Sequence, residues 1–396
     1  MLRDQDIDAW RSAGIITQAQ AERMLADLSA RRKDRASDKL IMTVSTIGAL
    51  LLGIGAILFV SANWQGFSHW TKSLILAGST FAVTAAGYWI GYETKTLPRV
   101  GTALVFLGTL LLGATIFFFA QMYHVQANSH VLVLLWLAGV LPLIYLLRST
   151  AIAGLSLVLG FVWFGLFVFR GMMFDWHEFP AFPVLYLLAG VLTFEVGGLH
   201  YTIEGLGPIA RVYRIGALKV MMASLFLLTF EFISGKEWFG HAAPYFSPQI
   251  TLGIVLIGAA AAAGAAVNGL KNPSRSETIT LETRISLGLT ALTLLYFLMP
   301  LPHTNVYPVL FNLAMAGCIL AFIAVGYRRE DLWLVNFGMS ALGLLVLVRY
   351  CDFFWELLPR SLFFMIGGAL LVLGGIALER QRRTLQVRFA HHGRPQ

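Results

Sequence analysis

The feature that most constrains the fold of this chain is a succession of apolar runs, each about as long as a bilayer is thick. A helix needs about 20 mostly apolar residues to cross the hydrocarbon core, and such runs follow one another from residue 40 onward with short connections. We place twelve of them, at 40–60, 72–92, 100–121, 130–147, 150–169, 181–199, 212–233, 250–268, 284–300, 307–326, 331–348 and 361–379. The sequence therefore predicts an all-α fold, a polytopic helical membrane protein with about 12 transmembrane helices.

Composition excludes the other classes of chain. The 396 residues are 57% hydrophobic and 13% charged, and the mean hydropathy is +0.72, whereas roughly a quarter of the residues of a soluble domain are charged. Disordered, collagen-like, coiled-coil and disulfide-rich chains are excluded on the same grounds. The two cysteines, Cys318 and Cys351, fall at different depths of neighbouring runs, so we expect no disulfide between them.

The distribution of basic residues predicts the orientation. Of the 29 Lys and Arg, alternate connections on the side of the N-terminus hold 23, the opposite side holds 5, and Lys219 lies inside a run. Because cytoplasmic loops are enriched in Lys and Arg, both termini are predicted to be cytoplasmic. The tail 380–396 has five Arg and no acid, which suits contact with anionic membrane lipids. The net charge of +8 therefore implies no nucleic-acid partner.

Residues 1–39 are polar and predict a cytoplasmic helical arm. Asp4 to Ala13 forms a first element, Gly14 breaks it, and Thr17 caps a second element with Gln20 three residues later, as in a capping box. The second element carries a thin apolar stripe made of Ile16, Met24, Leu25 and Leu28. Two interpretations stay open: an arm that flanks the membrane, or a docking site for a cytoplasmic protein partner.

Ionisable residues inside apolar runs are informative because each is unfavourable in lipid without a partner. Glu195 and Lys219 are expected about 6 and 10 Å from the same membrane face, on consecutive antiparallel helices. They could form a fixed pair that joins the two helices, Lys219 could reach the head groups instead, or the two could bind a proton or substrate. Glu231 lies near the opposite end of its run, where it either reaches the interface or joins the outer polar groups.

The outer ends of the runs collect histidines and carboxylates. The histidines are His69, His124, His130, His177, His241 and His303, and the carboxylates are Asp175, Glu178, Glu237, Asp352 and Glu356. Such residues can bind zinc or relay protons. However, HExxH, paired-cysteine and His-x-His spacings are absent, so we predict no metal site, no cofactor and no catalytic residue.

One further outer set is uncharged. Asn63 and Trp64 end the first run, and Gln121, Tyr123 and His124 end the third. The amides of Asn63 and Gln121 are expected at matching depth, either as an interhelical hydrogen bond or as a polar patch that faces a ligand. Glycines that allow close helix contact are predicted in the first and last runs: Gly48, Gly53, Gly55, Gly367, Gly368, Gly374 and Gly375.

The N-terminal third resembles the bacterial predicted-membrane-protein family with the domain of unknown function 2157 (DUF2157), over roughly residues 5–150. The matching features are Trp10, the stretches 14–17 and 62–64, the end of the third run at 120–124, and residues 135–142. The resemblance implies a multi-pass protein of the bacterial cytoplasmic (inner) membrane and no particular activity. It divides the chain into an arm (1–39), four helices (40–150), eight helices (150–379) and a basic tail (380–396).

Three classes of function remain open. The leading hypothesis is a transporter or translocator of a small or lipidic substrate, because short loops and few intramembrane charges suit it. The second is a non-catalytic scaffold or sensor that uses the cytoplasmic arm. The third is an enzyme that modifies envelope lipids at the outer face, which is weakened because the first outer loop, 61–70, contains no acid. Membrane lipids are the expected partners, and the substrate and oligomeric state are open.

Overall fold

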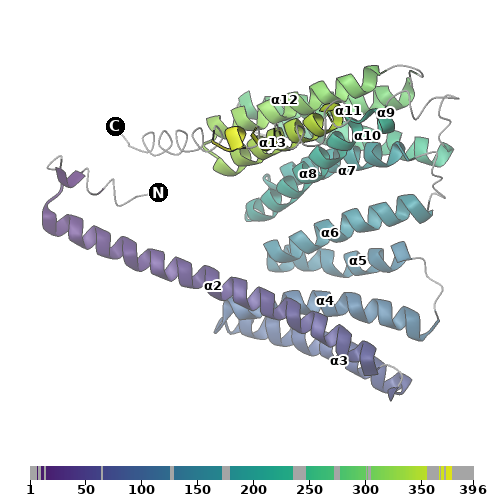
Figure 1. Ribbon diagram of the computed structural model, residues 1–396. Helices are drawn as coiled ribbons and strands as arrows, with labels where there is room; N and C mark the ends of the chain where they lie inside the picture. Colours follow the sequence, from purple (N-terminus) through teal and green to yellow (C-terminus); the bar gives the residue numbers. More distant parts are fainter. Residues whose placement is uncertain are drawn as a thin grey trace. The chain divides into compact units, whose positions relative to one another are not determined.

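A computed structural model describes most of the chain and confirms the all-α class (Figure 1). The described residues are 7, 10–12, 15–63, 66–124, 129–171, 179–234, 247–271, 277–299, 301, 305–354, 365, 367–369 and 372–376. All their regular elements are helices. They form two compact units, Met1–Gly171 and Met172–Gln396, so the division lies one helix further along the chain than the predicted boundary at residue 150.

The first unit begins with a single long helix, α2 (Gln18–Asn63). The predicted capping box is confirmed, because the Thr17 N–H donates to Gln20 Oε1 (2.9 Å) and the Gln20 N–H donates to Thr17 Oγ1 (3.3 Å). The helix then continues through the polar residues and into the first apolar run without a break. At 1.5 Å per residue it is about 69 Å long, so the second half of the arm and the first span are one rod.

Glycine contacts hold the next two helices together. Helix α3 (His69–Tyr88) continues through one π-helical segment, Trp89–Glu93, and α4 (Pro98–Met122) returns against it. A Cβ added at Gly91 would lie 2.9 Å from the Cα of Gly101, and one added at Gly87 would lie 2.7 Å from the backbone nitrogen of Val105. The two backbones therefore touch, as at small-residue crossings of membrane helices.

The remaining helices of the first unit pack more loosely. Helix α5 (Ser129–Leu147) packs against α6 (Thr150–Leu166), which a π-helical segment, Phe167–Gly171, extends. Trp136 joins α5 to α4 by donating its indole N–H to the carbonyl of Thr109 (2.8 Å). Pro142 lies inside α5 without ending it, as prolines often do in membrane helices.

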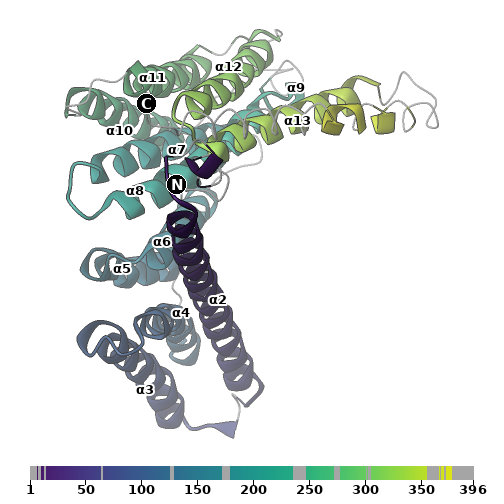
Figure 2. The same ribbon diagram turned by 90° about the vertical axis from the view of Figure 1, so that its left-hand side faces the viewer.

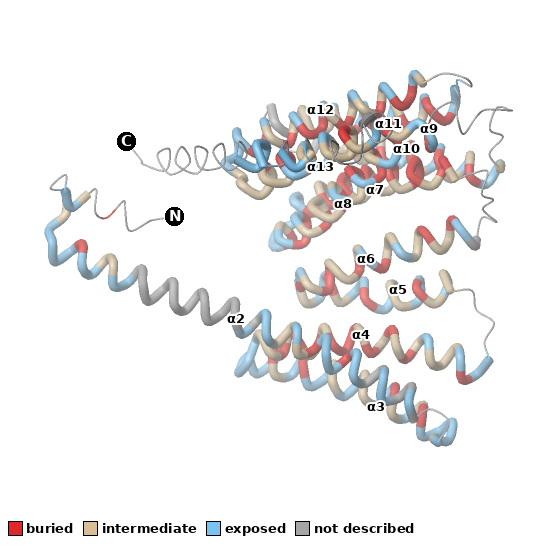
Figure 3. The backbone as a smooth tube through the Cα atoms, in the orientation of Figure 1, coloured by how far each residue is buried: buried red, intermediate tan, exposed pale blue. Residues whose placement is uncertain are grey.

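The second unit is built around α7 (Ala181–His200), and more than half of the residues of α7 are buried, as Figure 3 shows. The other helices are α8 (Gly207–Leu228), α9 (Glu231–Ser234), α10 (Pro248–Lys271), α11 (Glu277–Leu298), α12 (Val306–Arg328) and α13 (Leu332–Phe354). Helices α8, α10 and α11 contact α7, α12 contacts α8 and α11, and α13 packs on α12 (Figure 2). Helices α7, α8, α12 and α11 thus form a closed ring.

Nine helices of the described residues are long and apolar enough to cross a membrane, and each corresponds to a predicted run. Of the three other predicted runs, 40–60 is the second half of α2, and most of 361–379 lies outside the described residues. The third, 212–233, is wrong at its end, because α8 stops at Leu228 and Glu231 is the exposed first residue of α9. The charges Arg211, Arg214 and Lys219 lower the apolarity of α8, although its 22 residues could span about 33 Å.

Candidate functional site

The most deeply buried carboxylate among the described residues belongs to Glu195, which is 3% exposed in the middle of the second unit. Its partner comes from α10: the amide Nδ2 of Asn268 donates to Glu195 Oε2 (2.6 Å) and to the Glu195 carbonyl (2.8 Å). Glycines make room for this contact, because a Cβ at Gly198 would lie 2.5 Å from Asn268 Nδ2 and one at Gly264 would lie 3.0 Å from Glu195 Cβ. A buried polar bond therefore joins α7 to α10.

The predicted partner of Glu195, Lys219, lies elsewhere. Lys219 is exposed on α8, and the ion pairs of the described residues do not include one between these two side chains. The face of α8 that meets α7 carries Tyr213, Ala217 and Met221, which repeat every four residues. Lys219 is two residues from that series, so it points to the other side of the helix. The interpretation as a fixed pair is therefore wrong in this structure.

A three-member ion cluster lines the same pocket as Glu195. Glu282 of α11 accepts a hydrogen bond from Arg214 of α8 at 2.6 Å, and it forms an ion pair at 2.8 Å with Arg329, just after α12. The side chains of Arg214 and Glu282 are 17% and 19% exposed, and that of Arg329 is 37% exposed. The Arg214 guanidinium also lies over the ring of Phe194, 4.1 Å from its centroid, a cation–π contact. One carboxylate thus holds two guanidinium groups.

This cluster forms the mouth of a pocket of about 320 Å³ between α8, α11 and α12. Its charged lining consists of Arg211, Arg214, Arg329, Glu282 and Asp331, which is three positive and two negative groups, or a formal net charge of +1. Behind the mouth the walls are apolar, and they are formed chiefly by Leu218, Met221, Met222, Leu225, Leu289 and Phe322. From Arg211 to Leu225 the pocket follows α8 for about 21 Å.

A second pocket, also of about 320 Å³, lies on the other side of the cluster. It contains Glu195 and Asn268, and it shares with the first pocket Arg214, Glu282 and Arg329. The ion cluster therefore separates two spaces, one mainly apolar and one that reaches the buried Glu195.

Beyond the apolar walls, an aromatic group fills the other end of the ring. Tyr296, Tyr307 and Phe311 are at most 3% exposed. The ring of Tyr296 lies 5.0 Å from that of Tyr307 and 5.4 Å from that of Phe311. The Tyr307 hydroxyl donates to the carbonyls of Leu295 (3.1 Å) and Met299. These contacts close the space between α11 and α12 at the end opposite the ion cluster.

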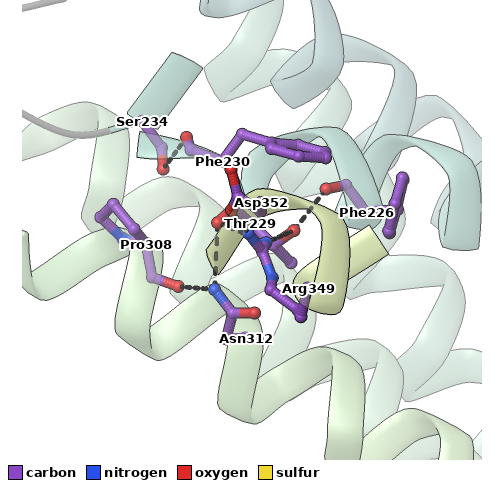
Figure 4. Close-up of polar contacts among 8 residues, drawn as sticks. All are labelled: Phe226, Thr229, Phe230, Ser234, Pro308, Asn312, Arg349 and Asp352. Atoms are coloured by element: carbon purple, nitrogen blue, oxygen red, sulfur yellow. Dashed lines mark hydrogen bonds and ion pairs between the residues drawn. The ribbon is translucent and has the colours of Figure 1, made fainter. Parts of the chain in front are cut away.

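Helix α8 ends at the same level in a polar network, which Figure 4 shows in close-up. The carbonyl of Thr229, just after α8, accepts from Asn312 Nδ2 (3.0 Å) and from Arg349 Nη2 (2.9 Å). Arg349 also donates to Asp352 Oδ2 (2.6 Å) and lies over the ring of Phe230, 4.8 Å from its centroid. The last carbonyls of a helix have no partner within it and form its negative end. Arg349 and Asn312 supply the missing donors.

Replacing Arg349 by methionine is expected to lower the free energy of unfolding by about 1–3 kcal/mol, because a charged donor to Thr229 is lost while the apolar stem is kept. Thermal unfolding of the detergent-purified protein measures the change. Arg284→Met is the matched control, since Arg284 is exposed on α11. Equal melting temperatures for the two variants would contradict a stabilising role for the Arg349 contacts.

The predicted site residues of the first unit are not brought together by the described contacts. Asn63 is the last residue of α2, and the side chains of Asn63 and Trp64 lie outside the described part. Gln121 is exposed and borders a shallow pocket of about 440 Å³. The Tyr123 hydroxyl lies 3.4 Å from Ser73 Oγ, and His124 follows with φ of 51°. The amide contact between Asn63 and Gln121 therefore stays a prediction.

Most of the outer histidine and carboxylate set also lies outside the described residues, namely His177, His241, His303, Asp175, Glu178, Glu237 and Glu356. Among the residues that the structure does describe, no group of three His, Cys, Asp or Glu side chains could hold a metal ion. Cys318 and Cys351 are both free thiols, as expected, and Cys318 lines the pocket between α8, α11 and α12.

Sequence reasoning counted Arg211, Arg214 and Arg329 only as topology signals and did not foresee the ion cluster. The sequence contained only a weak signal for this cluster. Glu282 is an acid close to the start of an apolar run, and Arg211 and Arg329 lie in connections predicted on the same membrane face. Only the packing of α8, α11 and α12 brings the three together.

The comparisons with known proteins bear on the first unit. Residues 8–153 match the family described as predicted membrane protein (DUF2157), which confirms the resemblance drawn from the sequence. No curated protein and no solved structure matches the chain. The matched residues end in α6, so the ion cluster and both of its pockets lie outside them.

Proposed function

Starting from a membrane protein whose N-terminal third matches the DUF2157 family, we propose that the chain translocates a small or lipidic substrate through its second unit. We further propose that it does so in the bacterial cytoplasmic membrane, with both termini cytoplasmic. In that orientation the ion cluster of Arg214, Glu282 and Arg329 lies at the cytoplasmic side, and the network of Thr229 and Arg349 at the outer side.

The observation that carries the proposal is the asymmetry of the ring formed by α7, α8, α12 and α11. At one end a pocket opens between charged side chains, and at the other end Tyr296, Tyr307 and Phe311 fill the space. A substrate pathway that is accessible from one side at a time needs one open and one closed end. The break after α8 adds support. Non-helical backbone at membrane depth is tolerated where protein groups hydrogen-bond to it or where it lines a cavity.

The lining favours the lipidic alternative over a small polar solute. Apart from its mouth, the pocket between α8, α11 and α12 is walled mainly by leucine, methionine and phenylalanine side chains, with Ser286 and Cys318 among them, so it offers few hydrogen bonds to a polar molecule. Apolar walls with a few charged groups at one end match a molecule that has an acyl chain and a polar head. Such a molecule can enter from the bilayer itself.

Filling the pocket tests the proposal. Ala321 lines the pocket and Leu320, its neighbour on α12, is 64% exposed. In vesicles that contain the purified chain and fluorescent phospholipids, wild type and Leu320→Phe are expected to move labelled lipid between leaflets. Ala321→Phe is expected to do so at a rate near that of protein-free vesicles. Chemical quenching of the outer-leaflet label measures the rate.

A specific observation also supports the scaffold or sensor as the second candidate. The cytoplasmic arm and the first span share the continuous helix α2, so a protein partner bound to residues 18–39 would act directly on a membrane helix. Equal lipid movement in Ala321→Phe and wild type, or none above protein-free vesicles in either, would contradict the translocator and leave this candidate.

A further inference from the structure

We propose that the apolar pocket of the second unit, between α8, α11 and α12, binds an acyl lipid with an anionic head group, and that Glu282 competes with this head group for Arg214 and Arg329. The inference rests on the proposed function, because it names the substrate class of the same pocket. It assigns the guanidinium groups as head-group ligands and the apolar walls as the seat of the acyl chain.

The charges at the mouth support an anionic rather than a neutral or cationic head. Arg211, Arg214 and Arg329 face two carboxylates, those of Glu282 and Asp331, so one positive charge is left over. Guanidinium groups bind phosphate and carboxylate oxygens through paired N–H donors. The Nε–H of Arg214 is buried and has no hydrogen-bond partner, so Glu282 leaves one donor of this guanidinium unsatisfied.

The position of Glu282 makes it an internal competitor. Its two oxygens each contact a different arginine: Oε2 accepts a hydrogen bond from Arg214, and Oε1 forms an ion pair with Arg329. A phosphate or carboxylate offers the same two oxygens to the same two donors. Arg214 is held in place independently of Glu282, since its guanidinium lies over the ring of Phe194, and it would therefore stay at the mouth when Glu282 is displaced.

The shape of the pocket supports an acyl chain behind the head. The apolar walls run from Leu218 to Leu225 on α8, Ile285 and Leu289 of α11 flank Ser286 beside them, and Phe322 and Val325 of α12 complete the lining. The volume of about 320 Å³ lies at the lower end of the range for small-molecule sites. It therefore suits one chain of a lipid, with the rest of the molecule left in the bilayer.

The test is a binding measurement on the detergent-purified full chain by native mass spectrometry. The probes are phosphatidylglycerol and phosphatidylcholine with identical acyl chains, a free fatty acid, and inorganic phosphate. Wild type is expected to bind phosphatidylglycerol at least about ten-fold more tightly than phosphatidylcholine, since bonds to charged donors supply that discrimination. Preference for the fatty acid would identify a free acid as the source of the ligand, and binding of phosphate alone would remove the acyl chain from the proposal.

Substitutions give opposite signs if Glu282 competes. Arg214→Gln and Arg329→Gln are each expected to reduce the preference for phosphatidylglycerol to within about two-fold. Glu282→Gln is expected to increase the affinity for phosphatidylglycerol, because it frees both arginines. Arg284→Gln removes an exposed arginine two residues away on α11 and should leave binding unchanged. A cluster that is only structural would instead lose binding in both Arg214→Gln and Glu282→Gln.

Two further outcomes are decisive. Equal binding of both phospholipids to wild type overturns the inference without any variant, so misfolding of Arg214→Gln cannot hide a failure. Arg329→Gln is the second variant, because it alters the more exposed arginine. The two proposals can fail independently. Selective lipid binding without lipid movement would refute the translocator but support this site. Lipid movement without a head-group preference would refute this site but support the translocator.

Discussion

Replacing Asn268 by leucine is expected to lower the free energy of unfolding of the second unit by about 2–4 kcal/mol. Asn268 donates to both the side chain and the backbone carbonyl of Glu195, and Glu195 is 3% exposed. Without the amide, the buried carboxyl of Glu195 loses its hydrogen-bond donor. Thermal or denaturant unfolding in detergent, followed by circular dichroism, measures the change.

A double-mutant cycle separates this contact from other effects. Glu195→Leu removes the carboxyl, so Glu195→Leu with Asn268→Leu should cost less than the sum of the single changes, by about 1–3 kcal/mol. Glu195→Leu with Lys219→Ala should be additive, because Lys219 is exposed on the other side of α8. Additivity in the first cycle, or coupling in the second, would show that Glu195 depends on a different partner.

The second large effect is expected at Gly101, where α3 and α4 touch. A Cβ at Gly101 would overlap the Cα of Gly91, and a leucine would force the two backbones apart. Overpacking typically costs about 1–3 kcal/mol and sometimes more, and we expect about 3 kcal/mol here because backbone rather than a flexible side chain is in the way. The measurement is the melting temperature of Gly101→Leu in detergent.

Gly78→Leu is the matched control for that experiment. Gly78 lies on α3, and a Cβ built there meets nothing within 4 Å, so leucine is expected to change stability by less than about 0.5 kcal/mol. If Gly101→Leu unfolds at the same temperature as Gly78→Leu, the close approach of α3 and α4 does not stabilise the unit.

What could be predicted from the sequence depended on local patterns. The apolar runs located nine helices, and the Thr17–Gln20 spacing located the start of α2, because both signals lie within one turn or one span. The length of α2 was not foreseen, since residues 18–39 are polar and residues 40–60 are apolar, and a change of hydropathy does not show whether a helix continues through it. The end of α8 was missed because hydropathy continues through Thr229 and Phe230.

Contacts between helices could not be predicted in the same way. Of the first-run glycines expected to make close contacts, Gly48 and Gly55 meet no neighbouring atom within 4 Å, whereas Gly53 meets Leu107. The tight crossing uses Gly91 and Gly101 instead. Likewise the sequence marks Glu195 as an ionisable residue inside an apolar run, but its partner Asn268 is 73 residues away. Which face of a helix meets a neighbour is a property of the packed unit.

The exposed side of α8 and α9 has a consequence for the surrounding membrane. Lys219 and Glu231 are both exposed. Only about 14 Å of α8 separates Lys219 from the end of the helix at Leu228, and Glu231 begins α9 three residues later. A lipid bilayer has a hydrocarbon layer of about 30 Å, so this side presents a mismatch that long lysine side chains reduce only in part. Bilayers of shorter acyl chains would fit it better, and the leaflets beside it should be drawn closer together than elsewhere.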